Sequence, residues 1–190
     1  MGIGRRIRDD HIHWSDSRTS VHGTGGQAGS HRTQAGVSPG GTEAGKRGEN
    51  QVLFVGTHER QLDEKGRLAL PAPFRSHLGE RCYLAVGDDQ CINVVPVERF
   101  EAMAADLVER VRRGEVDRQY QRVVSASATP VQVDRQGRVV VDANLRAYAG
   151  LTPESKVIVS GNFDVIEIWA PAQFELIQQA GTQAIAGGIR

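Results

Sequence analysis

Residues 62–71 read LDEKGRLALP, and residues 133–142 read VDRQGRVVVD. In both stretches an Asp is followed three positions later by Gly and four positions later by Arg, and apolar residues flank the motif. The second Asp-x-x-Gly-Arg motif begins 71 positions after the first. Repetition at a fixed offset decides the architecture of a chain before any single element does. The sequence therefore predicts two related structural units.

The Asp-x-x-Gly core of each motif predicts a tight turn between two strands. An Asp at the first position of a four-residue turn accepts a hydrogen bond from the backbone two residues later. A Gly at the fourth position takes the positive φ that follows a type I turn in a bulged hairpin. We therefore expect Asp63 and Gly66 to form one turn, and Asp134 and Gly137 to form the other.

Outward from the two turns, both halves of the chain show the same order of patterns. Each reads as strand, turn, strand, short helix, hairpin and helix, judged from apolar spacing, β-branched residues and Gly or Pro stops. A further helix is expected between the halves, over 114–128. The other clear elements are strands at 52–55, 81–86 and 91–96, a hairpin at 156–169, and helices at 72–79, 97–114, 143–150 and 171–180.

The predicted fold class is mainly β with short helices (α+β). A unit of about 50 residues is too small to bury a good core alone, so we expect the two units to fold against each other with pseudo-two-fold symmetry. Along the chain, the expected divisions are a disordered, low-complexity tail at 1–51, repeats at 57–103 and 128–172, a helical connector at 104–127, and a C-terminal helix and tail at 173–190.

Basic side chains gather on the two turns and on the short helices behind them. If the units pack symmetrically, these side chains form one basic face. The planar fork of arginine suits phosphate oxygens and the acceptor edge of guanine, and a β-hairpin tip can enter a DNA groove. The candidate DNA-binding residues are Lys65, Arg67, Arg75, Arg135, Arg138 and Arg146.

A simpler interpretation of the motif stays open: each Arg pairs with its own Asp and only stiffens the turn. An enzyme is the least supported class, because His58 and His77 are the only histidines after residue 51 and no nucleophile motif or carboxylate pair stands out. No cofactor or metal is expected. The two cysteines, Cys82 and Cys91, lack metal-ligand spacing and are expected to be reduced.

The charge of the whole chain is balanced, with 23 Lys and Arg against 23 Asp and Glu. A nucleic-acid-binding domain often carries a strong positive charge, so a DNA role must rest on a local patch. Residues 1–51 hold 11 of the 22 glycines and lack apolar periodicity. A segment of that composition does not bury enough apolar surface to offset its ordering entropy.

Residues 53–75, LFVGTHERQLDEKGRLALPAPFR, resemble the start of the MraZ family, bacterial transcriptional regulators with two SpoVT-AbrB-type repeats. The likeness covers 52–185, and its hallmark is the doubled Asp-x-x-x-Arg motif, which falls on Asp63 and Arg67 and on Asp134 and Arg138. The resemblance implies a tandem swapped-hairpin β-barrel. It also implies a repressor of the division and cell-wall gene cluster that contains its own gene, and ring-like homo-oligomers that read short direct repeats in double-stranded DNA. It places the protein in the cytoplasm, associated with the nucleoid.

Two departures from the family pattern matter. Asp142 ends the second motif where Pro71 ends the first, so the two turns need not contribute equally, and we expect Arg67 to have the larger effect. Chains of this family begin at about Val52, so we expect residues 1–51 to come from an upstream start. The alternatives to a regulator are an oligomeric scaffold without DNA binding and an AbrB-type antitoxin.

Overall fold

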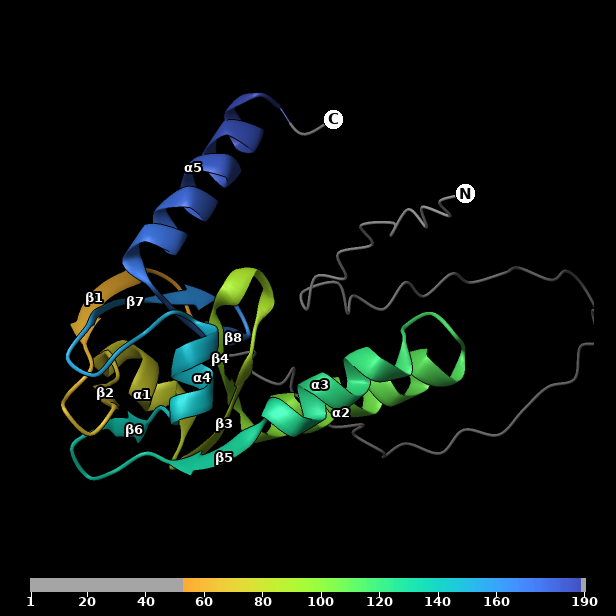
Figure 1. Ribbon diagram of the computed structural model, residues 1–190, viewed down its shortest axis with the longest axis horizontal. Helices are drawn as coiled ribbons and strands as arrows, with labels where there is room; N and C mark the ends of the chain where they lie inside the picture. The colour runs from red at the N-terminus through yellow and green to blue at the C-terminus, as the bar shows by residue number, and fades with distance from the viewer. Residues whose placement is uncertain (1–52, 189–190) are drawn as a thin grey trace, which may run out of the picture.

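The computed structural model describes residues 53–188, and the expectation for the tail at 1–51 lies outside that range. Within it, helices and short strands alternate in two similar halves (Figure 1). In chain order the elements are β1 (Thr57–Gln61), β2 (Arg67–Ala69), α1 (Ala72–Leu78), β3 (Arg81–Val86), the 3₁₀ turn η1 (Asp88–Gln90), β4 (Ile92–Pro96), α2 (Val97–Arg112), α3 (Arg118–Ser127), β5 (Thr129–Gln132), β6 (Arg138–Val140), α4 (Ala143–Tyr148), β7 (Lys156–Asn162), β8 (Val165–Trp169) and α5 (Pro171–Ala186).

Six strands form one antiparallel sheet in the order β1-β7-β8-β4-β3-β5. The first strand of each unit pairs with the other unit, because β1 lies against β7 and β5 lies against β3. The order reads the same from both edges when β1, β3 and β4 are exchanged for their counterparts β5, β7 and β8. The protein is therefore a mixed α+β fold in which the two units share one sheet.

The remaining strands, β2 and β6, form a separate two-stranded ribbon directly after the two predicted turns. Leu68 lies opposite Val139 at its centre, and both side chains are fully buried. A three-residue ribbon is not stable alone in water. Its stability comes from a single hydrophobic core to which both units contribute.

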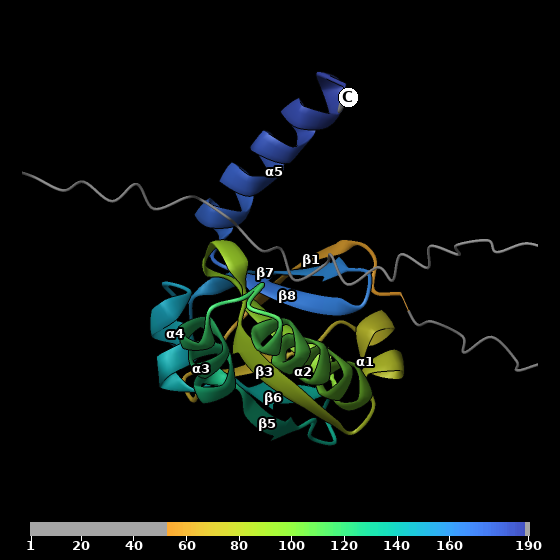
Figure 2. The ribbon, with the colours of Figure 1, turned by 90° about the vertical axis from the view of Figure 1, so that its right-hand side faces the viewer.

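The helices occupy three places around the sheet. α2 and α3 lie side by side and extend to the right in Figure 1, with Leu107, Val116 and Val124 buried between them. α1 and α4 lie on opposite sides of the body, as Figure 2 shows. α5 projects away from the sheet in both views. None of the helices within residues 53–188 combines the length and hydropathy needed to cross a bilayer.

The two short helices are started by different local chemistry. Pro71 precedes α1, and Gly79 ends it with a φ of 79°. At the corresponding place in the second unit, Asp142 accepts hydrogen bonds from the backbone N–H groups of Asn144 at 2.8 Å and Leu145 at 3.0 Å. The departure at Asp142 is thus a helix N-cap, which satisfies donors that the first turn of a helix leaves unpaired.

The prediction of a strand at 52–55 is wrong for its described part. Phe54 makes one isolated bridge to Phe163, and the first strand begins at Thr57. Gly56, at a φ of 94°, interrupts the extended backbone. Phe54 is only 1% exposed, because its ring enters the core and meets Phe74 edge-on at 5.8 Å. Its neighbours Leu53 and Val55 are 51% and 61% exposed, so Phe54 alone inserts into the core.

The expected closed barrel also differs from what is observed. Within residues 53–188 the ladders form an open six-stranded sheet and a separate ribbon. A single bridge between Leu62 and Leu68 connects the end of β1 with β2. Apart from that bridge, each ribbon strand has a ladder only with the other, so the ribbon is not joined to the sheet by a continuous ladder.

The apolar face of α2 is covered within the chain. Met103 and Leu107 are buried, and the ring of Phe100 stacks on Tyr83 with centroids 4.1 Å apart. α5 is different, since none of its residues is buried and Leu176 and Ile185 are 61% and 73% exposed.

Candidate nucleic-acid interface

The first motif forms the predicted turn. Oδ1 of Asp63 accepts the backbone N–H of Lys65 at 2.9 Å and that of Arg67 at 2.8 Å. The N–H of Gly66 donates to the carbonyl of Asp63 at 2.9 Å, and Gly66 has a φ of 71°. One carboxylate thus fixes the backbone on both sides of the turn, and Arg67 leaves it in a defined direction.

The second motif repeats this geometry. Oδ1 of Asp134 accepts the backbone N–H of Gln136 and that of Arg138, each at 2.9 Å. Gly137 donates to the carbonyl of Asp134 at 2.8 Å and has a φ of 74°. The sequence prediction for both turns is therefore confirmed, including the role of the glycine.

Each motif arginine also pairs with its own aspartate. Nε of Arg67 lies 2.5 Å from Oδ2 of Asp63, and Nε of Arg138 lies 2.8 Å from Oδ2 of Asp134. The simpler interpretation, a turn stiffened by its own ion pair, is therefore correct as geometry. The ion pair leaves N–H donors of each arginine available to a ligand, because a guanidinium has five N–H donors in a planar fork.

Hydrogen bonds from the backbone and from the arginines lower the pKa of both carboxyl groups. The backbone N–H of Arg67 lowers the pKa of Asp63 most. Desolvation is the second-largest effect and opposes it, and the side chain of Arg67 and the N–H of Lys65 lower the pKa further. For Asp134 the pKa is lowered first by the backbone N–H of Arg138 and then by its side chain. Both aspartates are thus ionised at neutral pH.

The ribbon brings the two turns to the same side of the molecule. In Figure 1 the turn between β1 and β2 and the turn between β5 and β6 both lie opposite α2 and α3. The N–H of Leu70 donates to Gly137, and the N–H of Val141 donates to Gly66, each at 2.9 Å. The turns are therefore separated by the extended chain from Gly66 to Leu70, about 13 Å at the usual rise of a strand.

Two of the predicted residues lie in a place that the sequence did not indicate. Arg75, on α1 of the first unit, lies against Gly137 in the second turn. Arg146, on α4 of the second unit, lies against Gly66 in the first turn. Lys65 and Arg135 are exposed within their turns, and Arg67 and Arg138 are partly exposed at the turn ends.

The surroundings of the two turns differ in charge. The groove beside the first turn has three carboxylates and two cations in its lining, whereas the groove beside the second turn has three cations and two carboxylates. The charged residues of the first are Asp63, Glu64, Lys65, Arg67 and Glu154. Those of the second are Arg75, Glu80, Arg81, Asp134 and Arg135. An anionic ligand is favoured more by the second groove.

Two of these groove residues were missed in the sequence. Glu154 and Arg81 lie outside the motifs, so the repeat pattern carried no signal for them. Each reaches a turn of the other unit: Glu154 lines the groove of the first turn and Arg81 that of the second. The pairing of β1 with β7 and of β3 with β5 explains this placement.

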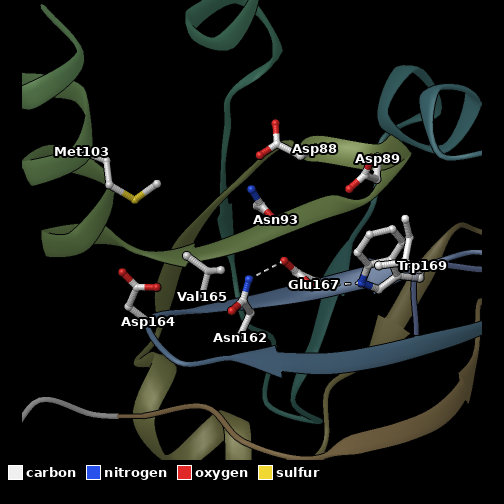
Figure 3. A pocket seen from close by; sticks show the side chains of 10 residues that line it. Asp88, Asp89, Asn93, Met103, Asn162, Asp164, Val165, Glu167 and Trp169 are labelled. Atoms are coloured by element: carbon white, nitrogen blue, oxygen red, sulfur yellow. Dashed lines mark hydrogen bonds between the residues drawn. The ribbon is translucent and has the colours of Figure 1, made fainter. Parts of the chain in front are cut away.

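A separate cavity of about 220 Å³ lies where η1, β4 and β8 meet α2 and α5 (Figure 3). Two of the carboxylates that line this cavity already pair with other side chains of the protein. Glu167 accepts bonds from Nδ2 of Asn162 at 2.8 Å and Nε1 of Trp169 at 3.1 Å, and Asp164 pairs with Arg99 at 2.5 Å. Among residues 53–188, no three His, Cys, Asp or Glu side chains are grouped so that they could hold a metal ion.

Both cysteines are free and buried. Burial raises the pKa of the Cys82 thiol to about 12 and raises that of Cys91 as well. A thiol of raised pKa is protonated at neutral pH and is a poor nucleophile or metal ligand.

Comparison with known proteins identifies the family. The family model described as "MraZ protein, putative antitoxin-like" matches residues 53–123 and 125–185. A protein named transcriptional regulator MraZ from Cutibacterium acnes is 36% identical over 134 residues, which cover 70% of this chain and 93% of that protein. Proteins of the same name are 44% identical in Saccharopolyspora erythraea, over 62% of this chain and 80% of the relative, and 43% identical in a Nocardioides species, over 69% and 89%. The resemblance inferred from the two motifs is thus confirmed, and the chain belongs to the MraZ family.

Proposed function

We propose that this protein is a DNA-binding transcriptional regulator whose two Asp-x-x-Gly-Arg turns contact double-stranded DNA together. The observation that carries the proposal is the presence of two rigid turns of one design on one side of the molecule. The ribbon places Arg67 opposite Val140 and Arg138 opposite Ala69, so the two motif arginines leave neighbouring strands two positions apart. The name transcriptional regulator, shared by the relatives, supports the same conclusion.

In this proposal four cations bind phosphates or base edges: Arg67 and Lys65 at the first turn, and Arg138 and Arg135 at the second. The aspartates keep their role in the turn, since their carboxylates are occupied by backbone donors. A guanidinium held by a carboxylate at one edge presents its other donors in a fixed direction. Such preorganisation lowers the entropy lost on binding.

The finer parts of the proposal come from the family resemblance. The protein acts as a repressor on the promoter of a division and cell-wall gene cluster that includes its own gene, and it reads short direct repeats. It works in the cytoplasm, associated with the nucleoid. Direct repeats suit a protein that offers the same pair of turns many times.

We further propose a swapped-hairpin organisation and a ring-like homo-oligomer. The pairing of each unit's first strand with the other unit supports the swap. The exposed apolar residues of α5, Leu176 and Ile185, support a contact between copies. Many turns in one ring raise the avidity for repeated sites without any new contact. A monomeric mass in light scattering at micromolar concentration would contradict the ring.

The test is a mobility shift with purified full-length protein and two duplexes of equal length. One duplex comes from upstream of the protein's own gene and the other is unrelated. We expect tighter binding to the first, and an affinity that falls linearly on a log-log plot against salt as phosphate contacts are lost. Equal, weak and salt-independent behaviour with both duplexes would instead support the scaffold.

An antitoxin is the second candidate, because the family description contains the words "antitoxin-like". An antitoxin must bind a toxin protein as well as DNA. Co-expression with the products of adjacent genes distinguishes the two functions: a stable complex with a protein that arrests growth would favour the antitoxin. The repeated turns favour the regulator.

A further inference from the structure

The glycine of each turn is buried, although the turns themselves are at the surface. A side chain of the other unit covers it in both cases. A Cβ added to Gly66 would lie 2.9 Å from Cζ of Arg146, and one added to Gly137 would lie 2.8 Å from Cζ of Arg75. The arginines therefore occupy the space that a side chain at the turn would need.

The contact at the second turn includes a hydrogen bond. Nη1 of Arg75 donates to the backbone carbonyl of Gln136 at 3.2 Å, directly before Gly137. The N–H of Leu70 donates to the carbonyl of Gly137 itself at 2.9 Å. The first unit thus holds the second turn from two directions, by a strand end and by a helix side chain.

The covered glycines are different from other glycines of the same conformation. Gly114 has the same φ of 74° as Gly137, but an added Cβ there would meet nothing within 4 Å. Positive φ alone therefore does not require a covering side chain. The arginine contact is a specific feature of the two turns, formed reciprocally between the units.

We propose that Arg75 and Arg146 are positioning residues, each holding the opposite unit's turn so that Arg138 and Arg67 point toward the DNA together. This inference rests on the proposed function for the DNA role of the motif arginines. It assigns a different role to two arginines whose charge alone suggested phosphate contacts. It also makes the two turns interdependent, since each unit sets the geometry of the other's turn.

The first test needs no DNA. Thermal unfolding is measured for Gly137→Ala and for the matched variant Gly114→Ala, each with Arg75 present and with Arg75→Ala. An alanine methyl at 137 displaces the flexible Arg75, so we expect Gly137→Ala to lower the Tm more than Gly114→Ala does. In the Arg75→Ala background the two alanine substitutions should have equal effects.

Arg81→Ala is the control for charge, because Arg81 is exposed in the same groove but does not cover Gly137. It should leave the effect of Gly137→Ala unchanged. If the Arg75 and Gly137 substitutions are additive, or if Arg81→Ala gives the same coupling as Arg75→Ala, the positioning contact is wrong whatever happens with DNA. If Gly137→Ala does not fold, adding Arg75→Ala should restore a folded protein. Failure to restore it would contradict the proposed contact.

The second test separates positioning from phosphate contact. A lost phosphate contact lowers the slope of log affinity against log salt by about 0.9 for duplex DNA. With the upstream duplex, Arg138→Ala should show that loss, and Arg75→Ala should bind severalfold more weakly. Added to Arg138→Ala, Arg75→Ala should leave the slope unchanged, because it has no phosphate contact of its own. A further fall of about 0.9 in the double variant would make Arg75 a phosphate contact and overturn the proposal. If the unaltered protein does not bind the duplex, the proposed function fails, and the Tm measurements alone decide the contact.

Discussion

At the scale of single residues, the two motif arginines are alike in the backbone and unlike in their surroundings. Arg67 and Arg138 follow turns of the same geometry and pair with their own aspartates. Glu64 and Glu154 add negative charge beside the first, whereas Arg135 is in the groove of the second. Since attraction to phosphate depends on the local field, equal motifs do not imply equal contributions.

We therefore revise the expectation that Arg67 dominates. Arg138→Ala should weaken binding to the upstream duplex at least as much as Arg67→Ala, and a base-edge contact would add about 1–3 kcal/mol of discrimination. Mobility shifts of both variants on specific and unrelated duplexes measure this. Should Arg67→Ala lose much more affinity at an unchanged Tm, the charge of the grooves would not be the deciding factor.

The turn aspartates predict a pH dependence of stability. Their pKa values in the folded protein lie below the ordinary 3.8. Between the lowered pKa of the folded protein and the ordinary value of the unfolded chain, the unfolded chain binds more protons. The stabilisation by these carboxylates is therefore complete above about pH 4 and is lost as the pH falls through the lowered pKa. The Tm difference between the wild type and Asp134→Asn should shrink as pH falls from 6 to 3. A constant difference would show that the charge of Asp134 has no part in the turn.

At the scale of elements, the short helices depend on their first residues. α4 has only six residues, and helices of that length are not stable alone. Asp142 caps it, whereas α1 begins with Pro71 in a preorganised backbone conformation. The difference in sequence at this point is thus a change of capping chemistry between two equivalent helices.

Asp142→Ala should lower the free energy of unfolding by about 0.5–2 kcal/mol, the usual range for a lost N-cap. Asp142→Asn retains an acceptor and should cost less. Denaturant unfolding of the two variants measures the difference. Equal destabilisation by both would mean that the charge of Asp142, or its 3.4 Å contact with Oγ1 of Thr129, matters more than the cap.

At the scale of the whole molecule, the core determines where the folded chain has to begin. Phe54 is buried and its backbone N–H donates to the carbonyl of Phe163 at 2.6 Å, so residues 54–56, just before β1, belong to the folded unit. Gly161 lies directly against the backbone of Phe54. The domain boundary predicted at 57 omits this contact, and those predicted at 103 and 172 fall inside α2 and α5.

A chain that begins at Val52 should have the same Tm and DNA affinity as the full chain, because it retains the buried side chain of Phe54. A chain that begins at Gly56 should be less stable by about 3–5 kcal/mol, as for other losses of a buried phenylalanine. Phe54→Ala in the full chain is the matched comparison. If the Val52 chain folds but loses DNA binding, the basic residues before it would act as an arm.

Features that depend on neighbouring residues could be predicted from the amino-acid sequence. The turns at Asp63 and Asp134, the positive φ of their glycines and the short helices after them depend on residues within a few positions, and all are observed. The fold class followed, since these patterns repeat. The misplaced strand at 52–55 shows the limit: an apolar run does not tell which of its residues is buried, and of those described only Phe54 is.

Which unit each element contacts could not be predicted from the sequence and is known from the packed fold. Nothing local distinguishes a β1 that pairs with β3 from one that pairs with β7, because both partners offer the same backbone groups and similar apolar faces. The spacing from Gly66 to Arg75 is the same as that from Gly137 to Arg146, yet each arginine covers the glycine of the other unit. In a repeated chain the choice between equivalent partners depends on packing of the whole core, which no single motif contains.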